Sequence, residues 1–241
     1  YYAMGHFDRA VAEYTEVIRL DPDSAIGYYS RGDAYYQQGD YDRSLSDLDE
    51  AVRLDPNDAV SYNQRGNVHF SSSAFDRAIV DYSEAIRLDP KYAVAFSIRG
   101  SAYFQLGEDD RAIADVDVAV KLDPTFVRGF ENRAYFYFVL ADYERAIEDY
   151  SEAIRLAPEV AETYASRAWS YLKAGTPDKA LKDANKALEI DPDDAYAYDA
   201  RGHIHEALGM KEEAIADFRH ALELNPSMQG SRDGLERLTA G

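Results

Sequence analysis

Seven of the eight prolines lie on a single period of 34 residues, and this spacing constrains the fold more than any other feature of the chain. The periodic prolines are Pro22, Pro56, Pro90, Pro124, Pro158, Pro192 and Pro226. Because proline inside a helix removes a hydrogen bond and clashes with the preceding turn, each is expected to end one element and start the next. A fixed period of this length predicts a repeat array, in which each unit packs mainly on its neighbours.

Each unit is predicted to be a helical hairpin. In residues 25–58, Tyr28, Gly32 and Tyr35 follow one helical face, and the pattern stops at Gly39, a residue suited to the left-handed position after a helix. A second helix is expected from Asp40 or Tyr41. Its apolar face is formed by Leu45, Leu48, Ala51 and Val52.

The hairpin recurs along the chain. The predicted organisation is a partial repeat at 1–24, complete repeats at 25–58, 59–92, 93–126, 127–160, 161–194 and 195–228, and a capping helix at 229–241. Ser72 to Ala74 lack the turn glycine, so that corner is expected to be less well terminated. Thr176 and Pro177 suit the N-cap and first position of a helix. Gly230 and Gly234 are expected to weaken the capping helix, so that it frays.

Several columns of residue types recur with this period. First-helix aromatics are Tyr28, Tyr62, Phe96, Phe130, Tyr164 and Tyr198. Small residues follow four positions later at Gly32, Gly66, Gly100, Ala134, Ala168 and Gly202. Second-helix alanines are Ala78, Ala112, Ala146, Ala180 and Ala214, with a second set at Ala85, Ala119, Ala153, Ala187 and Ala221. With the closing proline, these columns resemble the tetratricopeptide repeat. The resemblance implies an all-α, right-handed superhelical solenoid of antiparallel helix pairs, whose first helices line a concave groove that binds peptides or proteins.

The charge balance limits the classes of partner. The chain has 45 acidic and 26 basic residues and a formal net charge of −19, without a cluster of Lys and Arg. Such a field repels phosphates, so nucleic acid and anionic membranes are not expected as partners, whereas neutral or basic peptides are favoured. The absence of Cys excludes disulfides and fits a reducing or an oxidising compartment. No apolar run can span a bilayer and no signal peptide is present, which favours a soluble protein, with the cytoplasm ahead of the periplasm or secretion.

An arginine stands in each complete repeat where the family pattern has leucine. These residues are Arg31, Arg65, Arg99, Arg133, Arg167 and Arg201. An aspartate follows each of them sixteen residues later, at Asp47, Asp81, Asp115, Asp149, Asp183 and Asp217. A guanidinium near the hairpin interior needs acceptors, and a carboxylate on the facing helix can supply two. We expect a structural ladder of ion pairs, with an anion-binding stripe as the alternative. Arg99→Ala is then expected to lower stability and leave partner affinity unchanged.

Catalytic and metal sites are not predicted. His203 and His205 are two residues apart on a helix and point to different faces, so they cannot hold one metal together. His69 and His205 stand where other repeats have Tyr and are expected to pack. Residues 191–194 are acidic but lack the spacing and glycine of a calcium loop. No nucleophile, base and oxyanion donor occur at a matched spacing, so the chain is not expected to be an enzyme or to need a cofactor.

The resemblance places ligand contacts at the second, fifth, sixth, ninth, twelfth and thirteenth positions of the first helices. The candidate groove residues are Tyr29, Asp33, Asn63, Asn67, Arg128, Glu131, Asn132, Tyr135, Phe138, Trp169, Leu172 and Asp199. A family subset grips terminal carboxylates with Lys and Asn, but Asn63 and Ile98 occupy those positions here, and only Arg128 with Asn132 echoes the pattern. Chaperone tails are therefore not the expected ligand.

Two aromatic residues depart from the small polar residue that is common at the ninth position. Tyr135 and Trp169, together with Phe138, Val139 and Leu172, can form an apolar patch, and Trp and Tyr are enriched among residues that dominate binding energy. Two interpretations of this pair stay open: the two side chains form a hot spot for binding, or they only pack within the fold. Nearby amides suit a peptide backbone. Acids in the groove favour basic side chains, at Asp33, Glu131, Glu162, Asp199 and Glu206.

The sequence thus predicts a protein–protein interaction scaffold that binds an extended, neutral-to-basic peptide anchored near Trp169. Two alternatives stay open: a docking arm of a larger enzyme, such as a glycosyltransferase with a repeat array, and an array that associates through its end repeats. Tyr1 falls at the eleventh position of its repeat, partway through a first helix. We therefore expect either upstream sequence or another molecule to cover that hairpin face.

Overall fold

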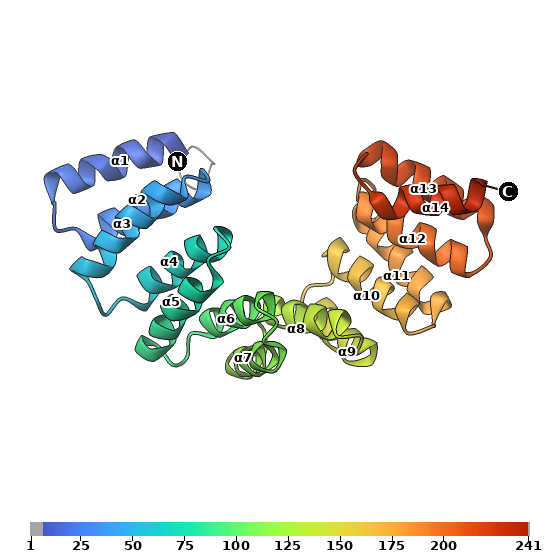
Figure 1. Ribbon diagram of the computed structural model, residues 1–241, viewed down its shortest axis with the longest axis horizontal. Helices are drawn as coiled ribbons and strands as arrows, with labels where there is room; N and C mark the ends of the chain where they lie inside the picture. Colours follow the sequence, from blue (N-terminus) through green and yellow to red (C-terminus); the bar gives the residue numbers. More distant parts are fainter. Residues whose placement is uncertain (1–6, 241) are drawn as a thin grey trace. The chain divides into compact units, whose positions relative to one another are not determined.

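The computed structural model describes residues 7–240, and these residues form helices joined by short turns (Figure 1). Tyr1 and Tyr2 of the predicted partial repeat lie outside the described residues. The chain divides into two compact units, unit 1 (Tyr1–Pro124) and unit 2 (Thr125–Gly241). The predicted all-α, helical-repeat fold class is confirmed.

Unit 1 consists of antiparallel helix pairs preceded by one further helix. Its helices are α1 (Phe7–Leu20), α2 (Ala25–Gln37), α3 (Tyr41–Leu54), α4 (Ala59–Ser71), α5 (Phe75–Leu88), α6 (Ala93–Gln105) and α7 (Asp109–Leu122). The pairs are α2 with α3, α4 with α5, and α6 with α7, and α1 packs against α2.

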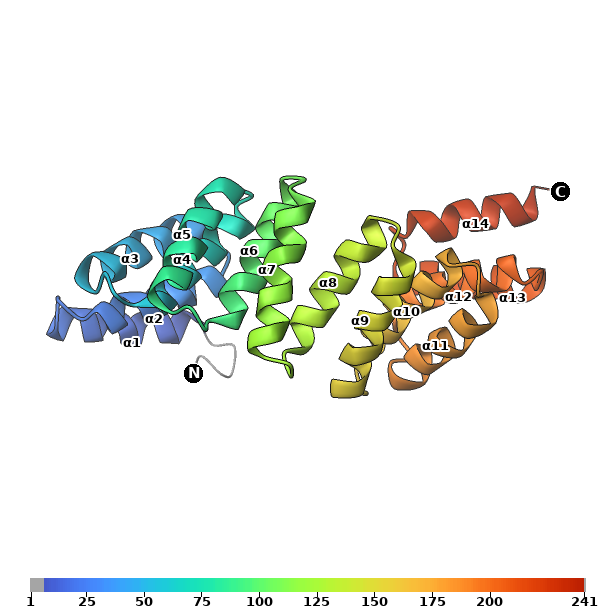
Figure 2. The ribbon, with the colours of Figure 1, turned by 90° about the horizontal axis from the view of Figure 1, so that it is seen from below.

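Unit 2 repeats the arrangement and ends with a single helix. Its helices are α8 (Val127–Val139), α9 (Tyr143–Leu156), α10 (Ala161–Lys173), α11 (Pro177–Ile190), α12 (Ala195–Ala207), α13 (Lys211–Leu224) and α14 (Gln229–Thr239). Figures 1 and 2 both show α14 alongside α12 and α13, and it contacts both. This terminal helix therefore packs on the last hairpin of unit 2.

The turns inside the hairpins require a left-handed residue, as Gly39 predicts. Glycines fill this position in four hairpins, with φ between +74° and +77°. Ser73 and Ala141 adopt φ of 59° and 61° in the other two. The corner at residues 72–74 therefore keeps the same turn geometry, but a residue with a Cβ occupies the strained position.

Replacing Ala141 by glycine should raise the free energy of unfolding by about 1 kcal/mol, because the left-handed conformation costs an L-residue that much relative to glycine. Urea unfolding would measure the gain. Ala157→Gly is the control, since Ala157 has φ of −137° and gains nothing from glycine. Equal midpoints for Ala141→Gly and the wild type would contradict the strain.

Helix starts are capped unevenly. Ser24, Asp58 and Asp194 accept backbone N–H bonds at the starts of α2, α4 and α12. Pro177 lies at the first turn of α11, as predicted. Thr176 occupies the N-cap position as predicted, but its hydroxyl donates to the Tyr171 carbonyl at 3.0 Å and accepts no backbone N–H.

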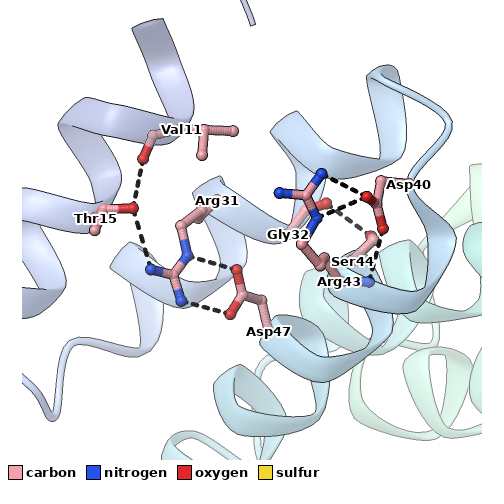
Figure 3. A network of polar contacts seen from close by, with 8 residues as sticks. All are labelled: Val11, Thr15, Arg31, Gly32, Asp40, Arg43, Ser44 and Asp47. Carbon is pink, nitrogen blue, oxygen red and sulfur yellow. Dashed lines mark hydrogen bonds and ion pairs between the residues drawn. The ribbon is translucent and has the colours of Figure 1, made fainter. Parts of the chain in front are cut away.

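The core of each hairpin is built where small residues let two helices approach. The second-helix alanine columns are fully buried. Ser44 replaces alanine in the first pair and donates to the Gly32 carbonyl at 2.7 Å (Figure 3). A Cβ on Gly66 would lie 2.6 Å from the Tyr82 ring, so glycine is required beside that aromatic side chain.

The two glycines of α14 also have a packing role that was not predicted from the sequence. A Cβ on Gly234 would lie 2.5 Å from the Phe218 ring, and one on Gly230 would lie 3.0 Å from the Asp199 carboxylate. Both glycines lower the intrinsic helix propensity. They also allow α14 to lie closely on α12 and α13, which offsets that cost through burial.

Candidate functional site

The arginine ladder is a set of buried ion pairs within the hairpins, as predicted. Each of the six arginines donates two hydrogen bonds to its aspartate, through Nε and Nη2, at 2.6–3.0 Å. All six aspartates are buried. The bidentate geometry satisfies both carboxylate oxygens, which is the condition for a buried pair to be tolerated.

The third donor of these arginines links neighbouring repeats. In unit 1, Nη1 of Arg31 donates to Thr15 Oγ1 at 3.2 Å (Figure 3), and Arg65 and Arg99 contact Asp49 and Ser83 in the same way. In unit 2, Arg167 and Arg201 reach Ser151 and Asn185. The guanidinium carbons of the six arginines also lie 5.3–5.8 Å from the centroid of the aromatic ring three residues earlier. These contacts support the structural role over the anion-binding stripe.

Two histidines lie close to aspartates of the arginine ladder. His205 is buried, and its Nδ1 lies 2.8 Å from Asp217 Oδ2, while His69 Nε2 lies 3.7 Å from Asp81. Burial lowers the pKa of His203, against the opposing effects of Asp199 and Glu206. In residues 7–240, no group of three or more His, Cys, Asp or Glu side chains is placed to hold a metal ion.

A pocket recurs with the register of the repeat. It lies between the start of one first helix, the loop that precedes the next first helix, and the first turn of that next helix. Among residues 7–240, copies of this pocket have volumes of about 330 Å³ in unit 1 and about 510 and 630 Å³ in unit 2. These pockets were not predicted from the sequence period.

The three copies differ in chemistry. The unit-1 pocket includes Ile26, Tyr29, Asp55, Asp58, Val60 and Ser61. The tyrosine pocket of unit 2 includes Arg128, Glu131, Tyr135, Val160, Glu162 and Thr163. The acidic pocket of unit 2 includes Glu159, Val160, Glu162, Asp191, Asp194 and Tyr196. Val160 and Glu162 line both pockets of unit 2, so these two pockets adjoin.

The predicted residues Arg128, Glu131, Asn132 and Tyr135 come together in the tyrosine pocket. Tyr135 is 50% exposed, so about half of its surface faces solvent. Glu131 accepts a hydrogen bond from Thr163 Oγ1 at 2.7 Å, which joins α8 to α10.

Trp169 lies elsewhere in unit 2 and is partly buried. Its ring centroid is 5.1 Å from that of His203 and 6.4 Å from that of Tyr196, and its Nε1 is buried without a hydrogen-bond partner. The ring therefore packs between α10 and α12. Truncating it would disturb that packing as well as any ligand contact.

The other predicted residues of unit 2 have internal contacts. Phe138 packs against Tyr143 in its own hairpin, with centroids 5.7 Å apart, and Leu172 packs on the core cluster that includes Ala168 and Ile204. Asp199 is buried and accepts a hydrogen bond from Ser231 at 2.6 Å. The structure thus does not bring these three residues together with Tyr135 in its pocket.

Asn67, one of the two predicted amides of unit 1, belongs to a hydrogen-bonded chain. Gln64 donates to Asp33 at 2.6 Å, Asn67 donates to Gln64 at 2.9 Å, and Tyr82 donates to Asn67 at 3.0 Å. This chain links α2, α4 and α5. Asp33 and Asn67 therefore have an inter-helix role in addition to any ligand contact.

Asn63 is buried, and its Oδ1 has no hydrogen-bond partner. At the equivalent positions, Glu131 and Asp199 are satisfied by a hydroxyl thirty-two residues later. The residue thirty-two positions after Asn63 is Ala95, whose side chain cannot donate a hydrogen bond. Tyr29 is half-buried in the unit-1 pocket.

Tyr196, which lines the acidic pocket, should lose its phenol proton at a higher pH than an ordinary tyrosine. Burial, with Asp199, Asp194 and Glu162, raises its pKa to about 12, against about 10 in an unfolded chain. The unfolded chain then loses this proton first, so the contribution of Tyr196 to stability is present below pH 10 and is lost as the pH rises to 12. The difference between the absorbance titrations of wild type and Tyr196→Phe should have its midpoint near pH 12. A midpoint near 10 would contradict the burial effect.

A family model described as tetratricopeptide repeat matches residues 1–59 and 132–195, and further models of this repeat match residues 66–107, 94–126 and 195–228. The chain belongs to the tetratricopeptide repeat family. The comparison with curated protein sequences found no match.

Solved structures of similar fold include several repeat proteins. A chain of the APC/C hetero-tetramer Cut9–Hcn1 has 18% identity and a TM-score of 0.82, over 98% of this chain and 46% of that one. This tetratricopeptide repeat chain therefore spans less than half of that protein. MamA has 26% identity and a TM-score of 0.61, over 71% of this chain and 93% of its own. YrrB, described as a TPR protein with an unusual peptide-binding site, has 21% identity and a TM-score of 0.59, over 78% and 97%.

Membership of the tetratricopeptide repeat family assigns the chain to a class of protein–protein interaction scaffolds, which are generally not enzymes. Among residues 7–240, no helix has both the length and the apolar character needed to cross a membrane.

Proposed function

We propose that this tetratricopeptide repeat chain binds an extended, neutral-to-basic peptide of a partner protein at the tyrosine pocket of unit 2. The observation that carries the proposal is the half-exposed Tyr135 ring beside a cavity of about 510 Å³. An exposed aromatic ring next to a cavity is the usual form of a binding anchor, because it buries a large apolar area at little conformational cost.

The polar groups around the ring suit a peptide. Asn132 and Ser166 line the pocket and can contact a peptide backbone, which needs both donors and acceptors. Glu131 and Glu162 outnumber the single cation, Arg128, and the adjoining acidic pocket adds Asp191. This balance favours basic side chains on the ligand, in agreement with the net charge of −19.

We expect Tyr135→Ala to weaken the binding of peptides that were selected from a peptide array by about 2 kcal/mol or more. Without the ring, the residue no longer buries a large apolar area against the peptide. Isothermal titration of the wild type and the variant would measure the loss. Leu140→Ala is the matched control, since Leu140 is also exposed at the end of α8 but does not line the pocket. Glu162→Gln should weaken basic peptides, and Arg128→Gln should strengthen them. Equal affinities for Tyr135→Ala and the wild type would overturn the proposal.

A further inference from the structure

We infer that unit 1 has a second docking surface, at its first-helix starts, for an extended partner segment with branched apolar side chains flanked by Lys or Arg. This surface is separate from the tyrosine pocket and does not depend on the function proposed there. Its core is the unit-1 pocket, of about 330 Å³, between α2, the loop before α4, and α4 itself.

The apolar part of the surface comes from the second residue of successive first helices. Ile26 on α2 is 74% exposed, Val60 on α4 is 44% exposed, and Val94 on α6 is 37% exposed. Ile26 and Val60 line the same pocket, with Tyr29 in its wall. Because successive first helices, α2, α4 and α6, supply these side chains, a segment that contacts all of them must cross these helices in an extended form.

The charged part of the surface is acidic. Asp55 and Asp58 line the pocket, and none of its lining residues is basic. Asp58 is engaged as the cap of α4, through Val60 N and Ser61 N at 3.1 and 3.0 Å. Asp55 is exposed, and only its Oδ1 accepts a backbone bond, from Asn57. Asp55 is therefore the carboxylate best placed to receive a cation from a partner.

Tyr29 supplies the aromatic part of the pocket, which it lines together with Asp58 of the loop. Burial raises the pKa of Tyr29 to about 12, because desolvation disfavours the charged phenolate.

The equivalent positions of the tyrosine pocket have the opposite chemistry. Ile26, Tyr29 and Val60 on the helices correspond to Arg128, Glu131 and Glu162, and the loop residues Asp55 and Asp58 correspond to Ala157 and Val160. The helices are apolar and the loop is acidic in the unit-1 pocket, whereas the helices are charged and the loop is apolar in the tyrosine pocket. The two pockets therefore place their apolar and charged groups in opposite order, and we expect a segment that fits one to bind the other more weakly.

A synthetic peptide tests this surface directly. The probe is a labelled peptide in which isoleucine and serine alternate between terminal lysine pairs, since alternate side chains of an extended segment share one face. Fluorescence anisotropy with the full chain should show binding. Replacing the lysines by glutamates, or the isoleucines by serines, should weaken it by about tenfold or more.

Matched variants locate the binding. Ile26→Ser combined with Val60→Ser should weaken the lysine–isoleucine peptide by about tenfold or more, because both side chains lose apolar contact area. Val80→Ser should not, since Val80 is 68% exposed on α5 and does not line the pocket. Ile26→Ser alone and Asp55→Asn each change one exposed side chain of the pocket. Each should lose less affinity for the peptide than the double variant loses.

Three outcomes would overturn the inference. The first is equal binding by the double variant and the wild type, which would indicate unspecific attraction to the acidic chain. The second is equal binding of the lysine and glutamate peptides. The third is a loss in Tyr135→Ala without a loss in the double variant, which would place this peptide in the tyrosine pocket and leave the proposed function intact.

Discussion

Asp183→Ala should lower the free energy of unfolding by about 3 kcal/mol, because it leaves a mostly buried guanidinium without its carboxylate. Arg167 donates to Asp183 at 2.7 and 2.9 Å, and its side chain is 17% exposed. The remaining acceptor, Ser151 Oγ at 2.9 Å, is neutral and satisfies one donor only. Urea unfolding followed by circular dichroism would measure the loss, and peptide affinity at the tyrosine pocket should not change.

An exposed ion pair on the same helix provides the control. Glu189 is 71% exposed and pairs with Lys186 on α11. Glu189→Ala should cost less than about 1 kcal/mol, because water solvates both charges when the pair is broken. Similar losses for Asp183→Ala and Glu189→Ala would show that burial of the ladder has no energetic consequence.

A double replacement separates charge from volume. Arg167→Leu, which restores the leucine of the family pattern, combined with Asp183→Leu removes both charges and keeps the site filled. Replacing a buried pair by apolar residues is often neutral, so this variant should recover most of the stability lost in Asp183→Ala. If it stays as unstable as the single variant, the loss reflects disrupted packing and not an unpaired charge.

The ladder could be predicted from the sequence because its geometry is local. The sixteen-residue separation places each arginine and aspartate on the two helices of one hairpin, and the hairpin brings them together wherever it forms. The helix bounds follow from the periodic prolines and turn residues for the same reason. The third arginine contact was not predicted, because it depends on a residue type one repeat earlier that varies among Thr, Asp, Ser and Asn.

The candidate site was harder to predict because exposure is set by neighbouring repeats. Tyr135 and Trp169 occupy the same position of their repeats, but Tyr135 is 50% exposed whereas Trp169 is covered by Tyr196 and His203. Nothing in the residues around Trp169 in the sequence shows this cover. Asn63 likewise has a buried carbonyl oxygen without a partner, for a reason that lies at Ala95 in the next repeat.

The glycines of α14 show a further limit of local reasoning. Propensity alone predicts a weak helix with Gly230 and Gly234. In the structure, Gly234 of α14 and Gly202 of α12 both lie against the Phe218 ring. A Cβ added to Gly202 would lie 2.6 Å from a ring carbon of Phe218. Whether a glycine weakens a helix or permits its docking depends on the surface that it meets.

Phe218→Ala should therefore lower the free energy of unfolding by about 3–5 kcal/mol, since it empties a fully buried aromatic site. Its second expected effect is specific to α14, which loses the ring against which it packs. Amide hydrogen exchange in residues 229–239 should accelerate more than exchange in α8. Leu224→Ala on the same helix is the control, and because Leu224 is 37% exposed it should cost about 1 kcal/mol or less.

The coupling between Phe218 and Gly234 gives the sharpest test of this packing. Gly234→Ala in the wild type should cost about 1–3 kcal/mol, because the added methyl group overlaps the ring. In a Phe218→Leu background the same change should cost less, since the smaller side chain leaves room for a Cβ. Additive losses would show that the methyl group and the ring do not compete for space. If the combined loss is smaller than the sum of the two single losses, the docking of α14 depends on the fit of the Phe218 ring between Gly202 and Gly234.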